Sequence, residues 1–319
     1  MINGELAKKI TYMSAIGDAL GVPVEFYNRT VLFMNPVEGY REGGTYGQPG
    51  GTWSDDTAFF LANLTGIYKI KNKLPKTPEN CMYDIFTECM NGKYWPDGEL
   101  FDIGETTQNA IESRKGESSE WSSGNGALMR AMPLFMYLYE PDKEYSKEDI
   151  DFILWNTSLT HDTTMAQAVN VFYLELSRRI MEYPEKSYDD LVKETTDYCR
   201  LAYEKGLLHV CGEMHEVVQQ VENLPAMKRS DIKSGGYCLN TLTAAIHCLL
   251  QPGNAKERLL MAVNLGDDTD TTAAVLGGLL GIREELPQGL FEGLRNKEII
   301  EETIDYAYEA KGDGNYRKR

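Results

Sequence analysis

Hydrophobic residues recur every three or four positions along most of the chain, which is the spacing of helices that bury one face. The first such stripe predicts a helix that ends near Leu20, before Val22-Pro23. Further stripes predict helices over 55–72, 79–91, 105–114, 126–139, 147–157, 163–183, 187–206, 210–221, 239–251, 255–264, 270–283 and 296–310. Alternating patterns typical of strands are nearly absent. We therefore expect a compact all-α fold of many helices, and the absence of a linker predicts a single domain over residues 1–319.

Glycine is concentrated in two places. Residues 27–52 lack helical periodicity and hold six glycines, so this stretch is long enough to predict a functional loop rather than a simple connector. The segment Gly277-Gly278-Leu279-Leu280-Gly281 lies instead within an expected helix. Small residues at this spacing let two helices approach closely, and we expect them to do so here.

Composition and charge narrow the classes of function. The 319 residues are 42% hydrophobic and 25% charged, which is ordinary for a globular protein. Lys and Arg number 32 against 49 Asp and Glu, a net charge of −17 that disfavours binding of nucleic acid through a basic face. A small anionic ligand would need local groups or a bound cation to offset this field.

The cysteines and the apolar runs indicate a compartment. The six cysteines form no CxxC pair and are interpreted as free thiols in a reducing environment. The longest apolar run, 271–282, is shorter than the about 18 residues that a membrane span requires. With no cleavable leader expected at the N-terminus, we predict a cytoplasmic protein without a membrane segment.

Two segments concentrate oxygen ligands just before apolar helical runs. They are Ser54-Asp55-Asp56-Thr57 and Asp267-Asp268-Thr269-Asp270-Thr271-Thr272. Each segment alone is explained by helix capping. A cap needs one acid, however, and neighbouring carboxylates repel each other unless a cation or a shared proton relieves them. If the two segments meet, they form a site for one or two hard cations such as Mg²⁺, Mn²⁺ or Ca²⁺.

Other polar residues allow two interpretations each. The segment Gly124-Asn125-Gly126 lies at the start of an expected helix, where free N–H groups bind phosphate, but it also suits an ordinary turn. Asp102 suits either a helix cap or a ligand, whereas spacing alone favours a surface role for Glu25 and a structural role for His161 over a role in a site. His209, Cys211 and His215 resemble a metal cluster, yet they lack the paired spacing of zinc sites.

Seven motifs in a fixed order are more specific than any one of them. The sequence resembles the ADP-ribosylglycohydrolase family over about residues 11–283. The motifs that carry the resemblance are Gly17–Gly21 with Glu25-Phe26, Trp53–Thr57, Asp102–Gly104, Gly124–Arg130, Thr160-His161, Ser234–Tyr237 with Thr241–Ala245, and Gly266–Thr271.

This resemblance implies an all-α fold and a site with two divalent ions, Mg²⁺ or Mn²⁺. The implied metal ligands are Ser54, Asp55, Asp56, Asp268, Asp270 and Thr271. Asp267 stands where many relatives have glycine, so it is left out. Glu25 would be a mobile acid that acts in catalysis with Asp55, Asp56 and Asp268, and Asp102 would lie near the ribose. The remaining implied substrate contacts are Gly124, Asn125, Gly126, Met129, His161, Gly235, Gly236 and Tyr237.

The resemblance also implies hydrolysis of the glycosidic bond between ADP-ribose and an acceptor. Arginine on a protein is the preferred acceptor, because the motifs look most like those of the bacterial activating glycohydrolases. Two alternatives stay open: another ADP-ribosyl linkage or a small ADP-ribosyl metabolite, and a non-catalytic binding or structural relative. We expect a stand-alone monomer.

Overall fold

The computed structural model describes residues 2–71, 77–205 and 213–309. Within these ranges every regular element is a helix, which confirms the all-α prediction. The α-helices are α1 (Gly4–Gly21), α2 (Arg29–Met34), α3 (Asp55–Lys71), α4 (Pro78–Met90), α5 (Glu105–Ser113), α6 (Met132–Leu138), α7 (Lys147–Ser158), α8 (Thr164–Glu182), α9 (Tyr188–Glu204), α10 (Glu213–Asn223), α11 (Cys238–Leu249), α12 (Ala255–Val263), α13 (Thr269–Arg283), α14 (Gln288–Gly293) and α15 (Lys297–Glu309). Five 3₁₀-helices, η1 (Val22–Val24), η2 (Gly44–Tyr46), η3 (Asn125–Ala127), η4 (Leu224–Ala226) and η5 (Arg229–Asp231), join them.

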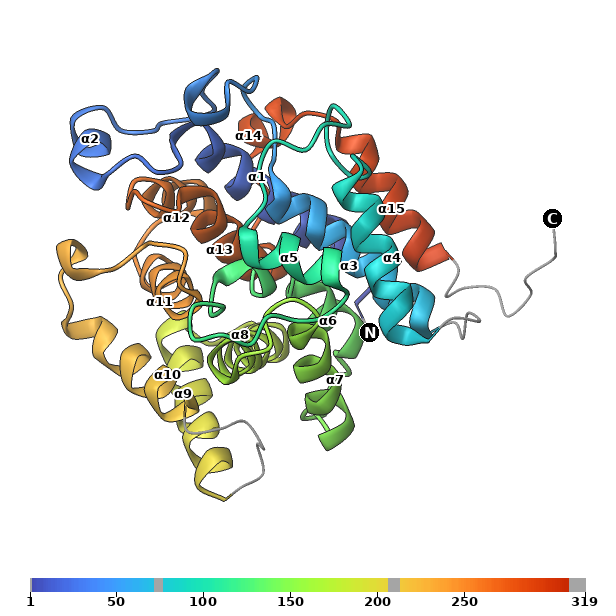
Figure 1. The fold of residues 1–319 in the computed structure, drawn as a ribbon. Helices are drawn as coiled ribbons and strands as arrows, with labels where there is room; N and C mark the ends of the chain where they lie inside the picture. The colour runs from blue at the N-terminus through green and yellow to red at the C-terminus, as the bar shows by residue number, and fades with distance from the viewer. Residues whose placement is uncertain (1, 72–76, 206–212, 310–319) are drawn as a thin grey trace.

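The centre of the fold is the close pair of α1 and α13, with α3 beside them (Figure 1). A Cβ atom at Gly17 would lie 2.2 Å from the carbonyl oxygen of Ala273, and one at Gly277 would lie 2.3 Å from that of Met13. Any larger residue would therefore push the two backbones apart. The expected close approach of two helices at Gly277 is confirmed.

Helix α3 is buried along nearly its whole length. Every residue from Asp55 to Tyr68 is buried, and the helix contacts α1, α4, α13 and α15. A helix that is covered on all sides brings the first turn of its sequence into the interior. The acids that begin α3 are consequently held at the centre of the molecule rather than at its surface.

Two local predictions differ from the structure. The stripe over 126–139 is split into η3 and α6, because Pro133 lacks an N–H group and lies at the start of α6. Helix α2 lies inside the glycine-rich stretch that was expected to be a loop. Leu32 is the one buried residue of α2, so this helix has no apolar stripe to reveal it.

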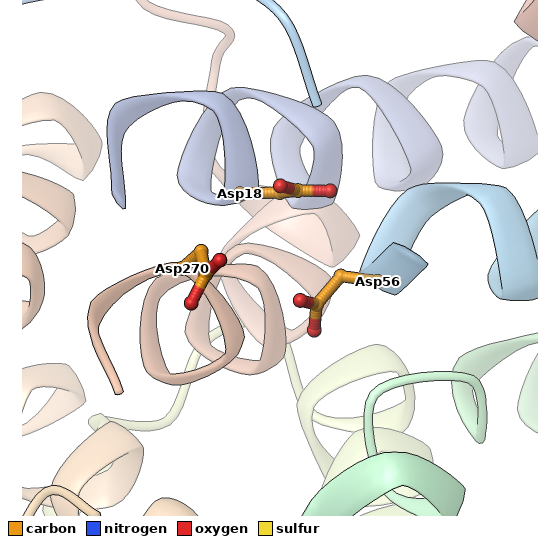
Figure 2. Close-up of side chains that lie close together, drawn as sticks. All are labelled: Asp18, Asp56 and Asp270. Atoms are coloured by element: carbon orange, nitrogen blue, oxygen red, sulfur yellow. The ribbon is translucent and has the colours of Figure 1, made fainter. Parts of the chain in front are cut away.

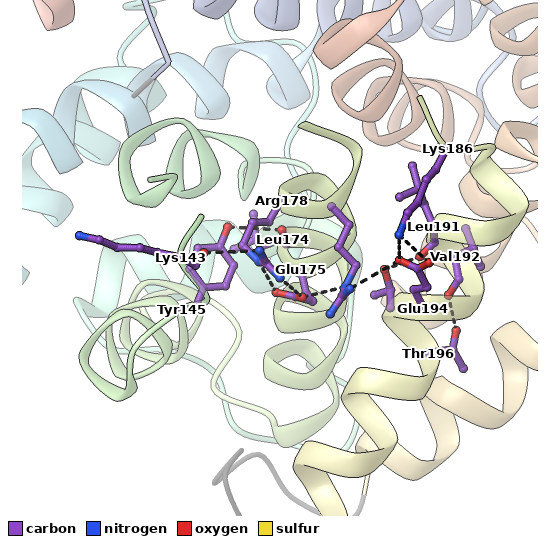
Figure 3. A network of polar contacts seen from close by, with 12 residues as sticks. Lys143, Tyr145, Leu174, Glu175, Arg178, Lys186, Leu191, Val192, Glu194 and Thr196 are labelled. Carbon is purple, nitrogen blue, oxygen red and sulfur yellow. Dashed lines mark hydrogen bonds and ion pairs between the residues drawn. The ribbon is translucent and has the colours of Figure 1, made fainter. Parts of the chain in front are cut away.

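A network of ion pairs joins α8 to α9 (Figure 3). The carboxylate of Glu175 is 2.7 Å from Nη2 of Arg178 and 2.9 Å from Nε of Arg179. Farther along, Glu194 lies 2.7 Å from the ammonium of Lys186 and 3.9 Å from Arg179. Each of these two carboxylates lies next to cationic side chains, so the chain itself balances the charge of the buried Glu175.

In the described ranges, no helix combines the length and the apolar character that crossing a bilayer requires.

Candidate active site

Three helices bring carboxylates together at the centre of the fold (Figure 2). Asp18 of α1, Asp56 of α3 and Asp270 of α13 each place a carboxylate oxygen within 4.8 Å of the others. Glu25 and Asp102 form a second such group with Asp270. The two oxygen-rich segments of the sequence therefore do meet in space.

Asp18 fixes the beginning of α3 from a different helix. Its Oδ1 atom accepts hydrogen bonds from the backbone N and the hydroxyl of Ser54, at 2.9 and 3.0 Å. Its Oδ2 atom accepts from the backbone N and the hydroxyl of Thr57, at 3.0 and 2.6 Å. Because Asp18 satisfies these N-terminal donors, Asp55 and Asp56 are not needed as caps.

The second segment does not use its acids as caps either. Asp268 is the residue before α13, yet its side chain makes no capping hydrogen bond. Its Oδ2 atom instead accepts from the amide of Asn125 at 2.8 Å. Asn125 comes from the glycine turn, so the cluster and the turn are held together directly.

Four buried carboxylate oxygens of this cluster have no hydrogen-bond partner among the described residues. They are Glu25 Oε2, Asp56 Oδ1, Asp268 Oδ1 and Asp270 Oδ2. The hydroxyls of Ser54 and Thr271 both point to the other oxygen of Asp56, at 3.2 Å. Unpaired anions are expensive to bury, so these oxygens require protons or cations. Oxygen donors of this kind fit Mg²⁺ or Mn²⁺.

The pKa values of the acids in the cluster also indicate that the site needs protons or cations. Burial, and then the neighbouring carboxylates, raise the pKa values of Asp55, Asp56 and Asp270 well above their usual range. Burial also raises the pKa of Asp18 to about 6, although the hydrogen bonds from Thr57 and Ser54 oppose the change. The cluster therefore strongly favours any species that adds positive charge.

A cavity of about 330 Å³ opens beside the cluster. It is lined by Glu25, Phe26, Asp55, Asp102, Ile103, Gly104, Glu105, Thr106, Thr107, Gly124, Asn125, Gly126, Met129, His161, Gly236, Asp268 and Thr271. The lining contains five carboxylates and neither lysine nor arginine. Of the predicted substrate contacts, Gly235 and Tyr237 lie outside this lining. Ser54, Asp56 and Asp270 are buried next to it.

The sequence analysis overlooked Asp18 and also Tyr46, which lies in the glycine-rich stretch. The phenol of Tyr46 faces Glu25 and Asp102, and it opposes the rise of both pKa values. Burial, followed by the charge of Asp102, still raises the pKa of Glu25 to about 8. Gly44 has a φ of +71°, and a Cβ there would lie 1.8 Å from the carbonyl oxygen of Pro23, so glycine is required for this loop path.

The glycine turn joins the cavity to the segment before α11. The backbone N of Asn125 donates to the carbonyl of Gly236 at 3.0 Å, and that of Cys238 donates to Ser123 at 3.0 Å. His209 and Cys211 lie outside the described residues. His215 is exposed on α10 and joins no acidic or metal-like cluster in the described chain.

Unpaired buried carboxylates beside a polar cavity define a class of proteins that can hold a divalent cation next to a bound ligand. Comparison with known proteins refines this class. The sequence model of the ADP-ribosylglycohydrolase family matches residues 9–316. The chain therefore belongs to the ADP-ribosylglycohydrolase family, as the order of its motifs predicted.

Relatives and a solved structure agree with this membership. An ADP-ribosylarginine hydrolase of Serratia proteamaculans is 28% identical over 280 residues, which cover 84% of this chain and 68% of the relative. An ADP-ribosyl-[dinitrogen reductase] glycohydrolase of Rhodospirillum rubrum is 24% identical, over 89% of this chain and 88% of the relative. A chain of an ADP-ribosylglycohydrolase-related protein complex has the same fold, with a TM-score of 0.67, 22% identity and coverage of 96% and 98%.

Proposed function

We propose that this protein is a metal-dependent hydrolase that cleaves the glycosidic bond between ADP-ribose and an arginine side chain of a protein. The observation that carries the proposal is the set of four unpartnered carboxylate oxygens in the acidic cluster, two of them from residues that line the cavity. Membership of the ADP-ribosylglycohydrolase family supports the reaction class.

The proposed ligands of two divalent ions, Mg²⁺ or Mn²⁺, come from both oxygen-rich segments. They are Ser54, Asp55, Asp56, Asp268, Asp270 and Thr271, with Asp18 as an additional carboxylate at the cluster. When bound, such ions polarise substrate oxygens and lower the pKa of a coordinated water. Bound cations would also offset the repulsion between a pyrophosphate and the five carboxylates that line the cavity.

The side chains of this protein supply position and proton transfer. Asn125 holds the carboxylate of Asp268 in place, and the glycines at 124 and 126 allow the turn to pack against the ring of His161. Glu25 is a cavity carboxyl whose raised pKa suits the exchange of a proton with a leaving group. A carboxylate oxygen of Asp102 lies within 4.8 Å of one from Glu25, so this second acid is close enough to influence the proton on the first.

Arginine is preferred as the acceptor for two reasons. The Serratia relative is an ADP-ribosylarginine hydrolase. The carboxylates of Glu25, Asp102 and Glu105 also line the cavity, and acids at this position favour a cationic guanidinium over a neutral hydroxyl. Serine-linked ADP-ribose and small ADP-ribosyl metabolites are the competing substrates.

The direct test measures release of free ADP-ribose by mass spectrometry. Arginine-linked, serine-linked and nucleobase-linked substrates are each incubated with Mg²⁺, Mn²⁺ or a chelator. We expect metal-dependent release from the arginine linkage. Release from another linkage would reassign the acceptor, and no release by folded, metal-loaded protein would reject the hydrolase.

The matched variants are Asp268→Asn in the cluster and Asp151→Asn on the surface of α7. Asp268→Asn is expected to lower activity by about 100-fold or more and to weaken Mn²⁺ binding, because it removes an anionic ligand while keeping the side-chain shape. Asp151→Asn should change neither, since its ion pair with Lys147 is exposed. Full activity and full Mn²⁺ affinity in Asp268→Asn would exclude this residue from the metal site.

A further inference from the structure

Arg130 is a cation that the fold buries completely next to the cavity. Its Nη1 atom donates to the side-chain oxygen of Asn156 at 2.9 Å, and Nη2 donates to the backbone oxygen of Asn156 at 3.0 Å and to the hydroxyl of Thr160 at 2.8 Å. Burial lowers the pKa of Arg130 to about 9, so the guanidinium is still charged at neutral pH. A guanidinium has donors and no acceptor, which gives each of these contacts a fixed direction.

The hydrogen bond from Arg130 to Thr160 determines the direction of the next hydrogen bond, between Thr160 and His161. The Thr160 hydroxyl is fully buried, accepts from Arg130 and lies 2.9 Å from Nδ1 of His161. Because Arg130 cannot accept, the hydroxyl hydrogen has one available acceptor, which is the Nδ1 lone pair. If Nδ1 carried the ring proton instead, a buried hydroxyl hydrogen would be left unpaired, which is unfavourable.

His161 then carries its proton on the nitrogen that faces the cavity. The ring is buried and lines the cavity. Burial and the charge of Arg130 lower the pKa of His161 to about 3, so the ring is neutral. Among the described residues Nδ1 has the Thr160 partner, and no hydrogen bond engages Nε2. A Cβ at Gly124 would lie 3.3 Å from Nε2 and one at Gly126 would lie 2.9 Å from Cε1, so glycine at both positions lets the turn that lines the cavity pack against this edge of the ring.

We propose that Arg130 and Thr160 are positioning residues that fix His161 as the Nε2–H tautomer, so that His161 donates a hydrogen bond to an acceptor oxygen of bound ADP-ribose. The identity of the ligand rests on the proposed function, whereas the tautomer is a property of the free protein. A neutral donor on this wall suits an oxygen of the pyrophosphate or of the distal ribose. It adds no charge to a cavity whose other polar groups are mainly acidic.

The tautomer is measured without any ligand. Protein labelled with ¹⁵N at histidine is examined by two-bond ¹H–¹⁵N correlation at neutral pH, and the His161 signals are assigned with His161→Gln. We expect a protonated Nε2 and a bare Nδ1. A protonated Nδ1, or an imidazolium, in the wild-type protein would overturn the proposal.

Thr160→Val removes the hydroxyl with little change of shape, and Thr160→Ser restores it. We expect Thr160→Val to give a mixture of tautomers and a three- to tenfold weaker affinity for ADP-ribose, about the loss of one hydrogen bond, and Thr160→Ser to resemble the wild type in both. Thr157→Val is the matched control, since Thr157 is a buried threonine of α7 whose hydroxyl donates to Ile153 rather than to the histidine. An unchanged tautomer and affinity in folded Thr160→Val would overturn the relay.

A comparison of ADP with ADP-ribose identifies the ligand oxygen that accepts the hydrogen bond from His161. If the loss in Thr160→Val is the same for ADP and ADP-ribose, the acceptor oxygen belongs to the pyrophosphate, and a loss restricted to ADP-ribose assigns it to the distal ribose. A wild-type protein that binds no ADP-ribose would contradict the proposed function and the role of His161 toward this ligand. The NMR measurement would still decide the positioning by Arg130 and Thr160.

Discussion

Buried acids occur in two regions of this protein, and their surroundings are opposite. On α8, the carboxylate of Glu175 lies between the guanidiniums of Arg178 and Arg179, so its charge is balanced by the chain itself (Figure 3). Where α1, α3 and α13 meet, the carboxylates face one another and four of their buried oxygens have no partner in the described residues. The acids are buried in both regions, but neighbouring cations balance the charge on α8 and none does so in the cluster of described residues.

This difference distinguishes an acid that stabilises the fold from acids that form a binding site. A buried ion pair can be explained by the fold alone, because each charge satisfies the other. A buried group of like charges cannot, since it is unfavourable until something positive arrives. An excess of acids at a cavity is therefore better evidence for a cation site than the number of acids or their burial.

The largest change in the free energy of unfolding is expected at Glu175, whose charge is balanced by neighbouring arginines. Glu175→Gln should lower the free energy of unfolding by about 3 kcal/mol, because it leaves the buried guanidinium of Arg178 without its carboxylate and removes one of the two carboxylates near Arg179. Urea unfolding followed by circular dichroism measures the change. The exposed variant Asp151→Asn should stay within about 0.5 kcal/mol of the wild type. A loss below about 1 kcal/mol for Glu175→Gln would show that this network does not depend on the pairing.

A smaller effect of the opposite sign is expected in the cluster. In a chelator at pH 8, Asp270→Asn should raise the free energy of unfolding by about 1–2 kcal/mol, since it removes one of several repelling buried carboxylates. Asparagine can still accept the hydrogen bond that the backbone N of Thr271 gives to Asp270 at 2.9 Å. With saturating Mn²⁺ the order should reverse, because the wild type gains more from bound metal.

The pH dependence checks the sign of the same prediction. Burial raises the pKa of Asp270 above its unfolded value of 3.8, so its contribution to stability is fully present below about pH 4 and is lost as the pH rises. Metal-free wild type should therefore lose stability between about pH 4 and pH 8, and Asp270→Asn should lose less of it. A metal-free variant that is less stable than the wild type at pH 8 would mean that the cluster is satisfied without a cation.

Sequence patterns predict those parts of the fold that depend on neighbours along the chain. Long helices with an apolar face were found, whereas α2 was missed because Leu32 is its single buried residue. The close approach of α1 and α13 left a signal in the glycines near Gly277, but nothing in the pattern indicated that Gly17 lies on the opposing helix.

The candidate site shows the same limit. Thr271 contacts Asp56 across 215 positions of the chain, a distance over which periodicity carries no information. The adjacent acids predicted a cation site if the two segments met, and the family resemblance then assigned the individual ligands. Asp18 did leave a signal, since a charged residue inside an apolar helical stripe requires a buried partner. Tyr46 left none, because its contacts depend on the path of the glycine-rich loop.

The smallest expected effect concerns Asp267, the acid next to the cluster that was left out of the ligand set. Its φ is +61°, in the left-handed region that favours glycine, and its backbone is held there by hydrogen bonds with Phe26 and Tyr27 at 2.7 and 2.9 Å. Asp267→Gly should raise the free energy of unfolding by about 0.5 kcal/mol, because relief of the Cβ strain slightly exceeds the added entropy of the unfolded chain.

The neighbouring position provides the matched opposite change. Gly266 has a φ of +82°, and a Cβ there would lie 2.7 Å from the backbone N of Arg29, so Gly266→Ala should lower the free energy of unfolding by more than about 1 kcal/mol. Urea unfolding compares the two variants, and titration with Mn²⁺ asks which acids hold metal. The affinity of Asp267→Gly should equal that of the wild type, because its carboxylate joins none of the acidic clusters. A tenfold weaker affinity would place Asp267 among the ligands and extend the unbalanced cluster by one acid.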